Sequence, residues 1–142
     1  MEPYLEVLHT KLDEANREKL LAIENPSLHR FIAEGIELCE PESVFVATDA
    51  PEDIAYVRRL AIESGEEIPL ATEGHTAHFD GFVDNERHDQ GRDKENTRYL
   101  VPPEMNLGEN LNAIGRQEGL SEVKGLLSGS MRGKQMLVRF FC

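Results

Sequence analysis

The segment SVFVATDAPEDIAYVRRLAIESG, residues 43–65, decides the fold class of this chain. Residues 43–48 are rich in β-branched and aromatic side chains and predict a short buried strand. Pro51 predicts the first turn of a helix that ends near Ser64, where Gly65 can serve as the C-cap. The apolar face of this helix is formed by Ile54, Val57, Leu60 and Ala61. A strand that leads into a helix favours a layered α/β arrangement.

Two more helices are predicted before this segment. The first extends from Tyr4 to about Glu24 and ends at Asn25-Pro26, because a residue before proline disfavours the helical conformation. Its apolar stripe consists of Leu5, Leu8, Leu12, Ala15, Lys19 and Ala22. The second helix has Asn25 as N-cap and Pro26 as its first residue, and it ends at Pro41. Its apolar face is formed by Leu28, Phe31, Ile32, Gly35, Ile36 and Cys39.

The second half of the chain adds strands around a long polar loop, residues 72–95. Strands are predicted at residues 96–101 and 134–141, with at least one more within residues 68–83. A short helix is predicted at residues 120–127, and residues 105–115 stay open, with an irregular helix as one alternative. We therefore expect one α/β domain over residues 1–142, with a mixed twisted sheet, helices packed on it, and residues 136–141 as the central strand.

Composition excludes several functional classes. The formal net charge is −12, from 27 acidic and 15 basic residues, which disfavours binding to nucleic acid. The two cysteines, Cys39 and Cys142, do not form the pattern of a disulfide framework and predict free thiols in a reducing compartment. No apolar run approaches the ~18 residues of a membrane span. We expect a cytoplasmic protein, and the apolar strand that ends at Cys142 favours a fragment of a longer one.

Three polar clusters are candidates for chemistry. The first contains His75, His78 and His88 with neighbouring carboxylates, and these residue types can bind Zn²⁺ or Mn²⁺. Their loose spacing favours a solvated polar loop instead. The second contains Arg92 in GRDKENT, residues 91–97, directly before a strand. An arginine at such a junction can hold a carboxylate or phosphate with its planar guanidinium, although a surface ion pair is the ordinary alternative.

The third cluster is GSMRGK, residues 129–134, which has some likeness to a phosphate-binding loop. A P-loop requires a glycine five positions before its Gly-Lys pair, and that position is Ser128. The cluster also precedes a strand, so no helix N-terminus faces a phosphate. The pattern is more typical of a glycine-containing turn that leads into a core strand.

Several segments, taken together, resemble GTP-dependent phosphoenolpyruvate carboxykinases. Residues 129–138, GSMRGKQMLV, are similar to the family's Gly-Cys/Ser-Met-basic-Gly-basic-Thr-Met-Tyr-Val segment, which begins a core strand. Residues 91–97 resemble its Ala/Gly-Arg-x-x-x-x-Thr segment, and residues 25–32 and 43–65 resemble its amino-terminal region. The chain departs from the family pattern at Gln135, which replaces Thr, at Leu137, which replaces Tyr, and at residues 139–141, where Arg-Phe-Phe replaces Ile-Pro-Phe.

The resemblance implies that this chain is the substrate-side, amino-terminal domain of a longer carboxykinase. By the same resemblance, Arg92 binds the carboxylate and phosphate end of oxaloacetate or phosphoenolpyruvate. The family's P-loop, its Mn²⁺ ligands, guanine pocket and mobile lid lie in a carboxyl-terminal nucleotide-binding domain. GTP and Mn²⁺ or Mg²⁺ are therefore expected to bind outside this chain, which contains no catalytic residue of its own and is expected to be inactive in isolation. A non-catalytic acidic interaction module and a small His-based metal-binding domain are the alternatives.

Overall fold

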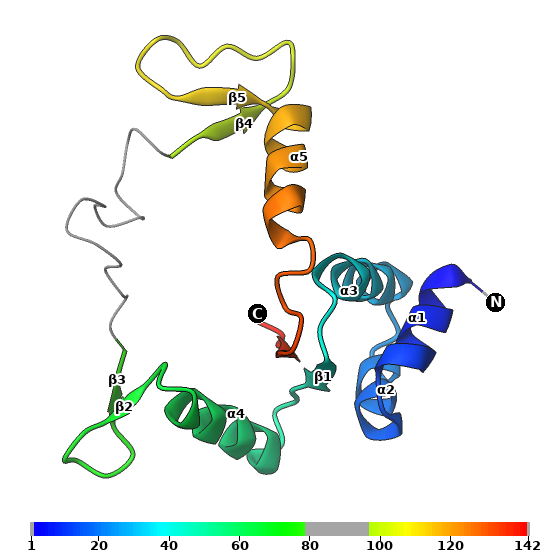
Figure 1. The fold of residues 1–142 in the computed structure, drawn as a ribbon, viewed down its shortest axis with the longest axis vertical. Helices are drawn as coiled ribbons and strands as arrows, with labels where there is room; N and C mark the ends of the chain where they lie inside the picture. Colours follow the sequence, from blue (N-terminus) through cyan, green and yellow to red (C-terminus); the bar gives the residue numbers. More distant parts are fainter. Residues whose placement is uncertain (1, 79–96, 142) are drawn as a thin grey trace. The chain divides into compact units, whose positions relative to one another are not determined.

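A computed structural model of the chain describes residues 2–78 and 97–141. The chain divides into two compact units: Met1–Ala77 together with Leu127–Cys142, and His78–Leu126. Each unit is described separately below, with the element labels of Figure 1.

The first two helices are α1 (Pro3–Lys11) and α2 (Glu14–Leu21), where the sequence predicted one continuous helix. The prediction was wrong because Asp13 acts as an N-cap. Its side chain accepts a hydrogen bond of 2.8 Å from the backbone N–H of Asn16, while Leu12 takes an extended conformation. A capping aspartate competes with the helix interior, so the chain turns at this point and a new helix begins.

Helix α3 (Pro26–Cys39) confirms the predicted cap and start. The Asn25 side chain accepts hydrogen bonds of 3.1 Å from the backbone N–H groups of Ser27 and Leu28. The buried residues of α3 are His29, Ile32, Ala33, Ile36 and Cys39. Phe31 was wrongly placed on the apolar face: it is 72% exposed, because it precedes the buried Ile32 and points to another side of the helix.

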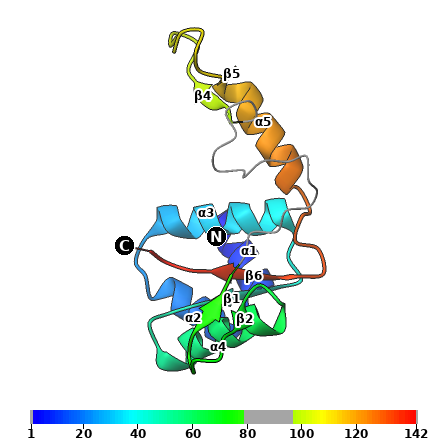
Figure 2. The same ribbon diagram turned by 90° about the vertical axis from the view of Figure 1, so that its left-hand side faces the viewer.

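The core of the first unit lies against the parallel pair of β1 (Ser43–Val46) and β6 (Gln135–Val138), in which Ser43 is opposite Gln135. Its buried residues come from α1, α2, α3 and β1 and from Leu12 between the first two helices: Leu8, Leu12, Leu20, Ile32, Ala33, Ile36, Val44 and Val46. Met136 and Val138 of β6 pack against this cluster. Figures 1 and 2 both show the strand pair between α3 and α4.

The rest of the first unit is α4 and a small hairpin. Helix α4 (Pro51–Glu63) begins at the predicted Pro51, and Gly65 follows its last turn with the positive φ of 78° that glycine favours. Strands β2 (Ile68–Pro69) and β3 (Thr76–Ala77) pair antiparallel, in the region where a further strand was predicted.

The second unit contains a parallel pair and a helix. Strand β4 (Tyr99–Val101) pairs with β5 (Ala113–Gly115), which lies at the end of the segment that sequence left open, and α5 (Arg116–Leu127) follows directly. Helix α5 approaches β4 closely at Gly119, where an added Cβ would lie 2.8 Å from Cγ of Leu100. An ion pair of 2.6 Å between Arg98 and Glu122 also connects this helix to the residue before β4.

The fold is α/β, as predicted, with both parallel and antiparallel strand pairs and helices beside them. The described strands form three separate two-stranded sheets. The prediction that residues 136–141 form the central strand of one larger sheet is therefore wrong for the described part of the chain. Strand β6 pairs with β1 alone within residues 2–78 and 97–141, because no other described strand runs beside it. None of the helices in these ranges is long and apolar enough to cross a membrane.

Candidate functional site

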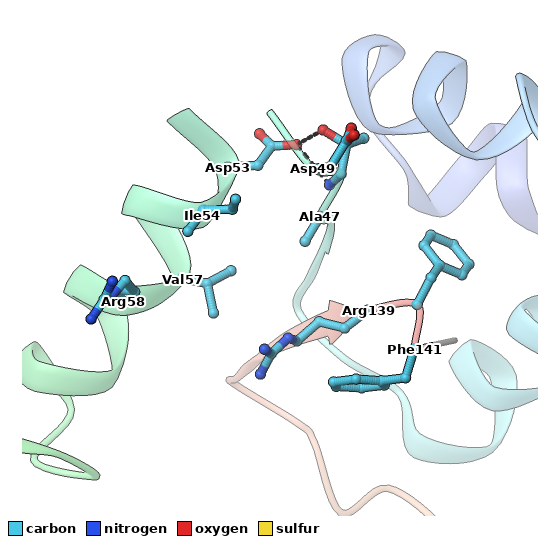
Figure 3. Close-up of a pocket in the computed structure, with 10 residues that line it drawn as sticks. Ala47, Asp49, Asp53, Ile54, Val57, Arg58, Arg139 and Phe141 are labelled. Carbon is cyan, nitrogen blue, oxygen red and sulfur yellow. Dashed lines mark hydrogen bonds between the residues drawn. The ribbon is translucent and has the colours of Figure 1, made fainter. Parts of the chain in front are cut away.

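A pocket of about 320 Å³ lies where β1 and β6 end. The two strands are parallel, so their carboxyl ends reach the same edge, and the loop after β1 leads directly into α4. Figure 3 shows the residues around the pocket. They come from the β1–α4 loop, from α4 and from the end of β6: Ala47, Thr48, Asp49, Asp53, Ile54, Val57, Arg58, Arg139, Phe140 and Phe141. In α/β proteins, ligands bind at the carboxyl ends of parallel strands.

Asp53 holds one wall of this pocket in place. Its carboxylate is buried on the first turn of α4 and binds Lys19 of α2, with Nζ at 2.7 Å from Oδ1 and 2.8 Å from Oδ2. Asp53 Oδ2 also accepts hydrogen bonds from the backbone N–H of Thr48 at 2.9 Å and from its hydroxyl at 2.7 Å. The hydrogen bonds from Lys19 and Thr48 lower the pKa of Asp53 from 3.8 to about 2.

Aromatic contacts extend this network to both strands. Lys19 Nζ lies 4.8 Å from the centroid of the Phe45 ring on β1, and that ring contacts Tyr56 of α4 with a centroid separation of 4.3 Å. The Tyr56 hydroxyl donates a hydrogen bond of 2.7 Å to Oε1 of Gln135 on β6. Four elements, α2, β1, α4 and β6, are therefore connected below the pocket.

Asn16 fixes the end of β1 from the other side. It is buried, and its Oδ1 accepts a hydrogen bond of 2.7 Å from the backbone N–H of Val46, the last residue of the strand. Its Nδ2 donates to both oxygens of Asp13, at 3.0 and 2.9 Å. These bonds, led by the bond from the Asn16 backbone, lower the pKa of Asp13. The Asn16 side chain thus connects the cap of α2 to the point where β1 enters the pocket loop.

Two arginines supply positive charge at the pocket. Arg58 donates a hydrogen bond of 3.2 Å from Nη2 to the carbonyl oxygen of Gly74, so its guanidinium lies toward the β2–β3 turn. Arg139 lies with its guanidinium carbon 5.1 Å from the centroid of the Phe141 ring, and Figure 3 shows its side chain extending from the end of β6 toward α4. No carboxylate within the described part of the chain forms an ion pair with either arginine.

Comparison with known proteins assigns the chain to a family. The family model described as the phosphoenolpyruvate carboxykinase N-terminal domain matches residues 30–142. The chain belongs to this family. The resemblance drawn from the GSMRGK segment and the Arg92 segment is thereby confirmed.

Curated relatives of this carboxykinase domain are named phosphoenolpyruvate carboxykinase [GTP]. The protein of Thermococcus kodakarensis is 47% identical over 137 residues, which are 96% of this chain and 21% of the relative. The Pyrococcus furiosus protein is 44% identical and the Saccharolobus solfataricus protein 40% identical, each over 141 residues, 99% of this chain and 22% of the relative. The chain spans about a fifth of the length of the relatives it matches.

The structure describes only some of the residues that the sequence predicts to bind substrate or metal in this carboxykinase domain. Arg92 and His88 lie outside the described residues, so their predicted roles stay predictions. His75 lies in the turn between β2 and β3, where its backbone N–H donates to Thr72 O at 3.1 Å, and His78 directly follows β3. In residues 2–78 and 97–141, no three His, Cys, Asp or Glu side chains are placed to hold one metal ion.

The GSMRGK segment forms a cap on α3. The backbone N–H of Gly129 donates to Leu38 O at 2.8 Å, and that of Met131 donates to Cys39 O at 3.0 Å. Arg132 adds two bonds to the Glu40 carboxylate, at 2.9 and 2.8 Å. Two N–H groups that a phosphate-binding loop would present to its ligand are therefore used by helix carbonyls. The turn that the sequence favoured is confirmed, and its function in this fold is to close α3.

The residues that shape the pocket were not predicted as a site, although the sequence contains one signal for them. Lys19 lies on the apolar stripe of the first predicted helix, and Asp53 lies four residues before Val57 on the apolar face of α4. A cation and an anion on the buried faces of two helices indicate a buried pair, because an isolated buried charge is costly. The Asn16 bond to Val46 has no comparable signal in the sequence.

Proposed function

We propose that this chain is the substrate-side part of a cytoplasmic GTP-dependent phosphoenolpyruvate carboxykinase, a carboxy-lyase. The reaction converts oxaloacetate and GTP into phosphoenolpyruvate, GDP and CO₂. The observation that carries the proposal is the match of residues 30–142 to the carboxykinase N-terminal domain, because the matched range includes Arg92 and its loop. The relatives are named phosphoenolpyruvate carboxykinase [GTP], which supports the same reaction.

In this proposal Arg92 positions the substrate. A guanidinium presents parallel N–H donors that match the two oxygens of a carboxylate or phosphate, and it stays charged at every relevant pH. Phosphoryl transfer depends mainly on positioning and on neutralisation of charge. An arginine that holds oxaloacetate by its carboxylate end positions the substrate and neutralises part of its charge.

The nucleotide and the metal are bound elsewhere in the protein. The chain covers 21% of the Thermococcus kodakarensis relative, so most of a carboxykinase of that length lies outside it. Within the chain, the segment with the strongest likeness to a P-loop has two of its N–H groups, those of Gly129 and Met131, bonded to the end of α3. GTP and Mn²⁺ or Mg²⁺ therefore bind to a carboxyl-terminal nucleotide-binding domain, and the isolated chain does not turn over.

The test is a hybrid enzyme. The 137 matched residues of the Thermococcus kodakarensis carboxykinase are replaced by the corresponding residues of this chain. The hybrid is expected to form phosphoenolpyruvate from oxaloacetate only when GTP and a divalent metal are present, whereas the 142-residue chain alone forms none. A soluble, folded hybrid without activity would contradict the proposal, as would turnover by the chain alone.

A further inference from the structure

The residue that directly follows the Arg92 segment, residues 91–97, is held by α5. This residue is Arg98, and its guanidinium Nη2 lies 2.6 Å from Oε1 of Glu122. The hydrogen bond from Arg98 lowers the pKa of the Glu122 carboxyl, which is therefore charged at neutral pH. Glu118, one turn earlier on the same helix, attracts the same guanidinium. The side chain of Arg98 is thus bound to the acidic side of α5.

Two further contacts extend this attachment into β4. The backbone N–H of Tyr99 donates a hydrogen bond of 2.8 Å to the carbonyl oxygen of Asn112, which precedes β5. Leu100 packs against α5 at Gly119, where an added Cβ would lie 2.8 Å from Cγ of Leu100. Figure 1 shows β4 beside β5, with α5 continuing directly from β5. Residues 98–100 are therefore attached at three consecutive positions to β5, the residue before it, and α5.

The distance along the chain makes this attachment important for Arg92. Arg92 lies six residues before Arg98, and six extended residues span at most about 20 Å. On the other side, the described chain ends at His78, fourteen residues before Arg92, which corresponds to a reach of about 50 Å. The attachment at Arg98 therefore limits the positions open to the Arg92 guanidinium more tightly than β3 does.

The ion pair between Arg98 and Glu122 contributes little to the stability of the fold. The two side chains are 41% and 44% exposed, and water screens the attraction between exposed charges. The geometry of a reaction is more sensitive, because a displacement of about 1 Å at the reacting groups can lower a rate about 100-fold. A pair at this place in the chain therefore affects positioning more than folding.

We propose that Glu122 is a positioning residue of the carboxykinase reaction, which holds Arg98 and thereby sets where Arg92 meets the carboxylate end of oxaloacetate. The assignment rests on the proposed function, in which Arg92 binds the substrate. Glu122 acts through Arg98 and is not assigned a contact with the substrate. Its loss leaves Arg92 charged, so the expected consequence is weaker binding of oxaloacetate with little change in the chemical step.

Steady-state kinetics of the hybrid enzyme described above test the proposal. Glu122→Gln keeps the size of the side chain and removes its charge, so it is expected to raise the KM for oxaloacetate about tenfold and to change kcat by less than about twofold. The urea midpoint of the 142-residue chain should stay unchanged, because the pair is exposed. Glu63→Gln is the matched control: it removes a charge from an exposed pair with Arg59 on α4 and is expected to change neither quantity.

Two further variants show whether the effect passes through Arg98 and through Arg92. Exchange of the two partners, Arg98→Glu together with Glu122→Arg, restores their attraction and is expected to return the KM to within about twofold of the parent hybrid. In an Arg92→Lys hybrid, Glu122→Gln is expected to raise the KM no further, because the guanidinium that Glu122 positions is no longer present.

The outcomes separate this proposal from the proposed function. An active hybrid in which Arg92→Lys lowers kcat/KM but Glu122→Gln leaves the KM unchanged would overturn the positioning role and leave the carboxykinase assignment intact. Equal effects of Glu122→Gln in the presence and absence of Arg92 would also overturn it, as would an elevated KM in the exchanged pair or in Glu63→Gln. A soluble, folded hybrid without activity would contradict the proposed function and this proposal together.

Discussion

Removing the charge of Asp53 should destabilise the first unit by a predictable amount. The substitution Asp53→Asn keeps the size of the side chain and removes the ion pair with Lys19, whose two contacts are 2.7 and 2.8 Å. The pKa of Asp53 falls from 3.8 to about 2 on folding, and each pKa unit corresponds to about 1.4 kcal/mol. The buried carboxylate therefore contributes about 2–3 kcal/mol to the free energy of unfolding at neutral pH.

The pH dependence has a defined direction. Because the folded-state pKa is lowered, the contribution is fully present above the unfolded value of 3.8 and is lost as the pH falls toward about 2. Urea unfolding of the wild-type chain and of Asp53→Asn should therefore differ by about 2–3 kcal/mol at pH 7 and by less than about 0.5 kcal/mol near pH 2.

Asp49 provides the matched control for this experiment. It lies in the same loop and is exposed, and the Lys19 ammonium binds Asp53 in its place, so Asp49→Asn should change the unfolding free energy by no more than about 0.5 kcal/mol at either pH. The reasoning is refuted if Asp53→Asn matches the wild type at pH 7, or if the difference at pH 7 persists unchanged at pH 2.

Two further predictions concern the fold, and both are checked by urea unfolding at pH 7. Asn16→Ala should lower the free energy of unfolding by about 1–3 kcal/mol, because the Val46 N–H loses its acceptor in a buried position; a value near zero would contradict this. Gly125→Ala should stabilise α5 by about 0.5–1 kcal/mol, because alanine favours a helix and an added Cβ meets nothing there. The Gly119→Ala variant should be about 1–2 kcal/mol less stable than the Gly125→Ala variant, because its added Cβ would lie 2.8 Å from Cγ of Leu100. Equal stabilities of the two variants would contradict the close approach of α5 to β4.

The local signals for helix ends and strands were sufficient for much of the first unit. Asn25-Pro26 and Pro51 each placed a helix start correctly, because proline fixes φ and a preceding polar side chain or loop satisfies the first N–H groups. The apolar runs at residues 43–48 and 134–141 contain β1 and β6, because apolar and β-branched side chains suit a buried pleated strand, but both predicted strands extend beyond the observed Ser43–Val46 and Gln135–Val138. Both signals depend on residues that are near each other in the chain.

The features that could not be predicted from the sequence depend on contacts between distant residues or on competition between two local signals. Asp13 has ordinary neighbours for a helix interior, and only its capping bonds to Asn16 show that a helix begins there. The function of GSMRGK as a cap on α3 depends on Leu38 and Cys39, about ninety residues earlier in the chain. The pocket likewise requires the parallel pairing of β1 with β6, which sequence patterns do not specify. Arg92 was identified by resemblance to a family rather than by spacing or composition.

The most direct measurement of the central claim is the kcat/KM of the hybrid enzyme for oxaloacetate after substitution of Arg92. Arg92→Lys keeps the charge and removes the paired donors of the guanidinium, so kcat/KM is expected to fall about 100-fold or more, or about 3 kcal/mol in transition-state free energy. Arg59→Lys, an exposed arginine of α4 that pairs with Glu63 at 3.7 Å, should retain the activity of the parent hybrid. An Arg92→Lys hybrid with unchanged kcat/KM would show that this guanidinium does not hold the substrate.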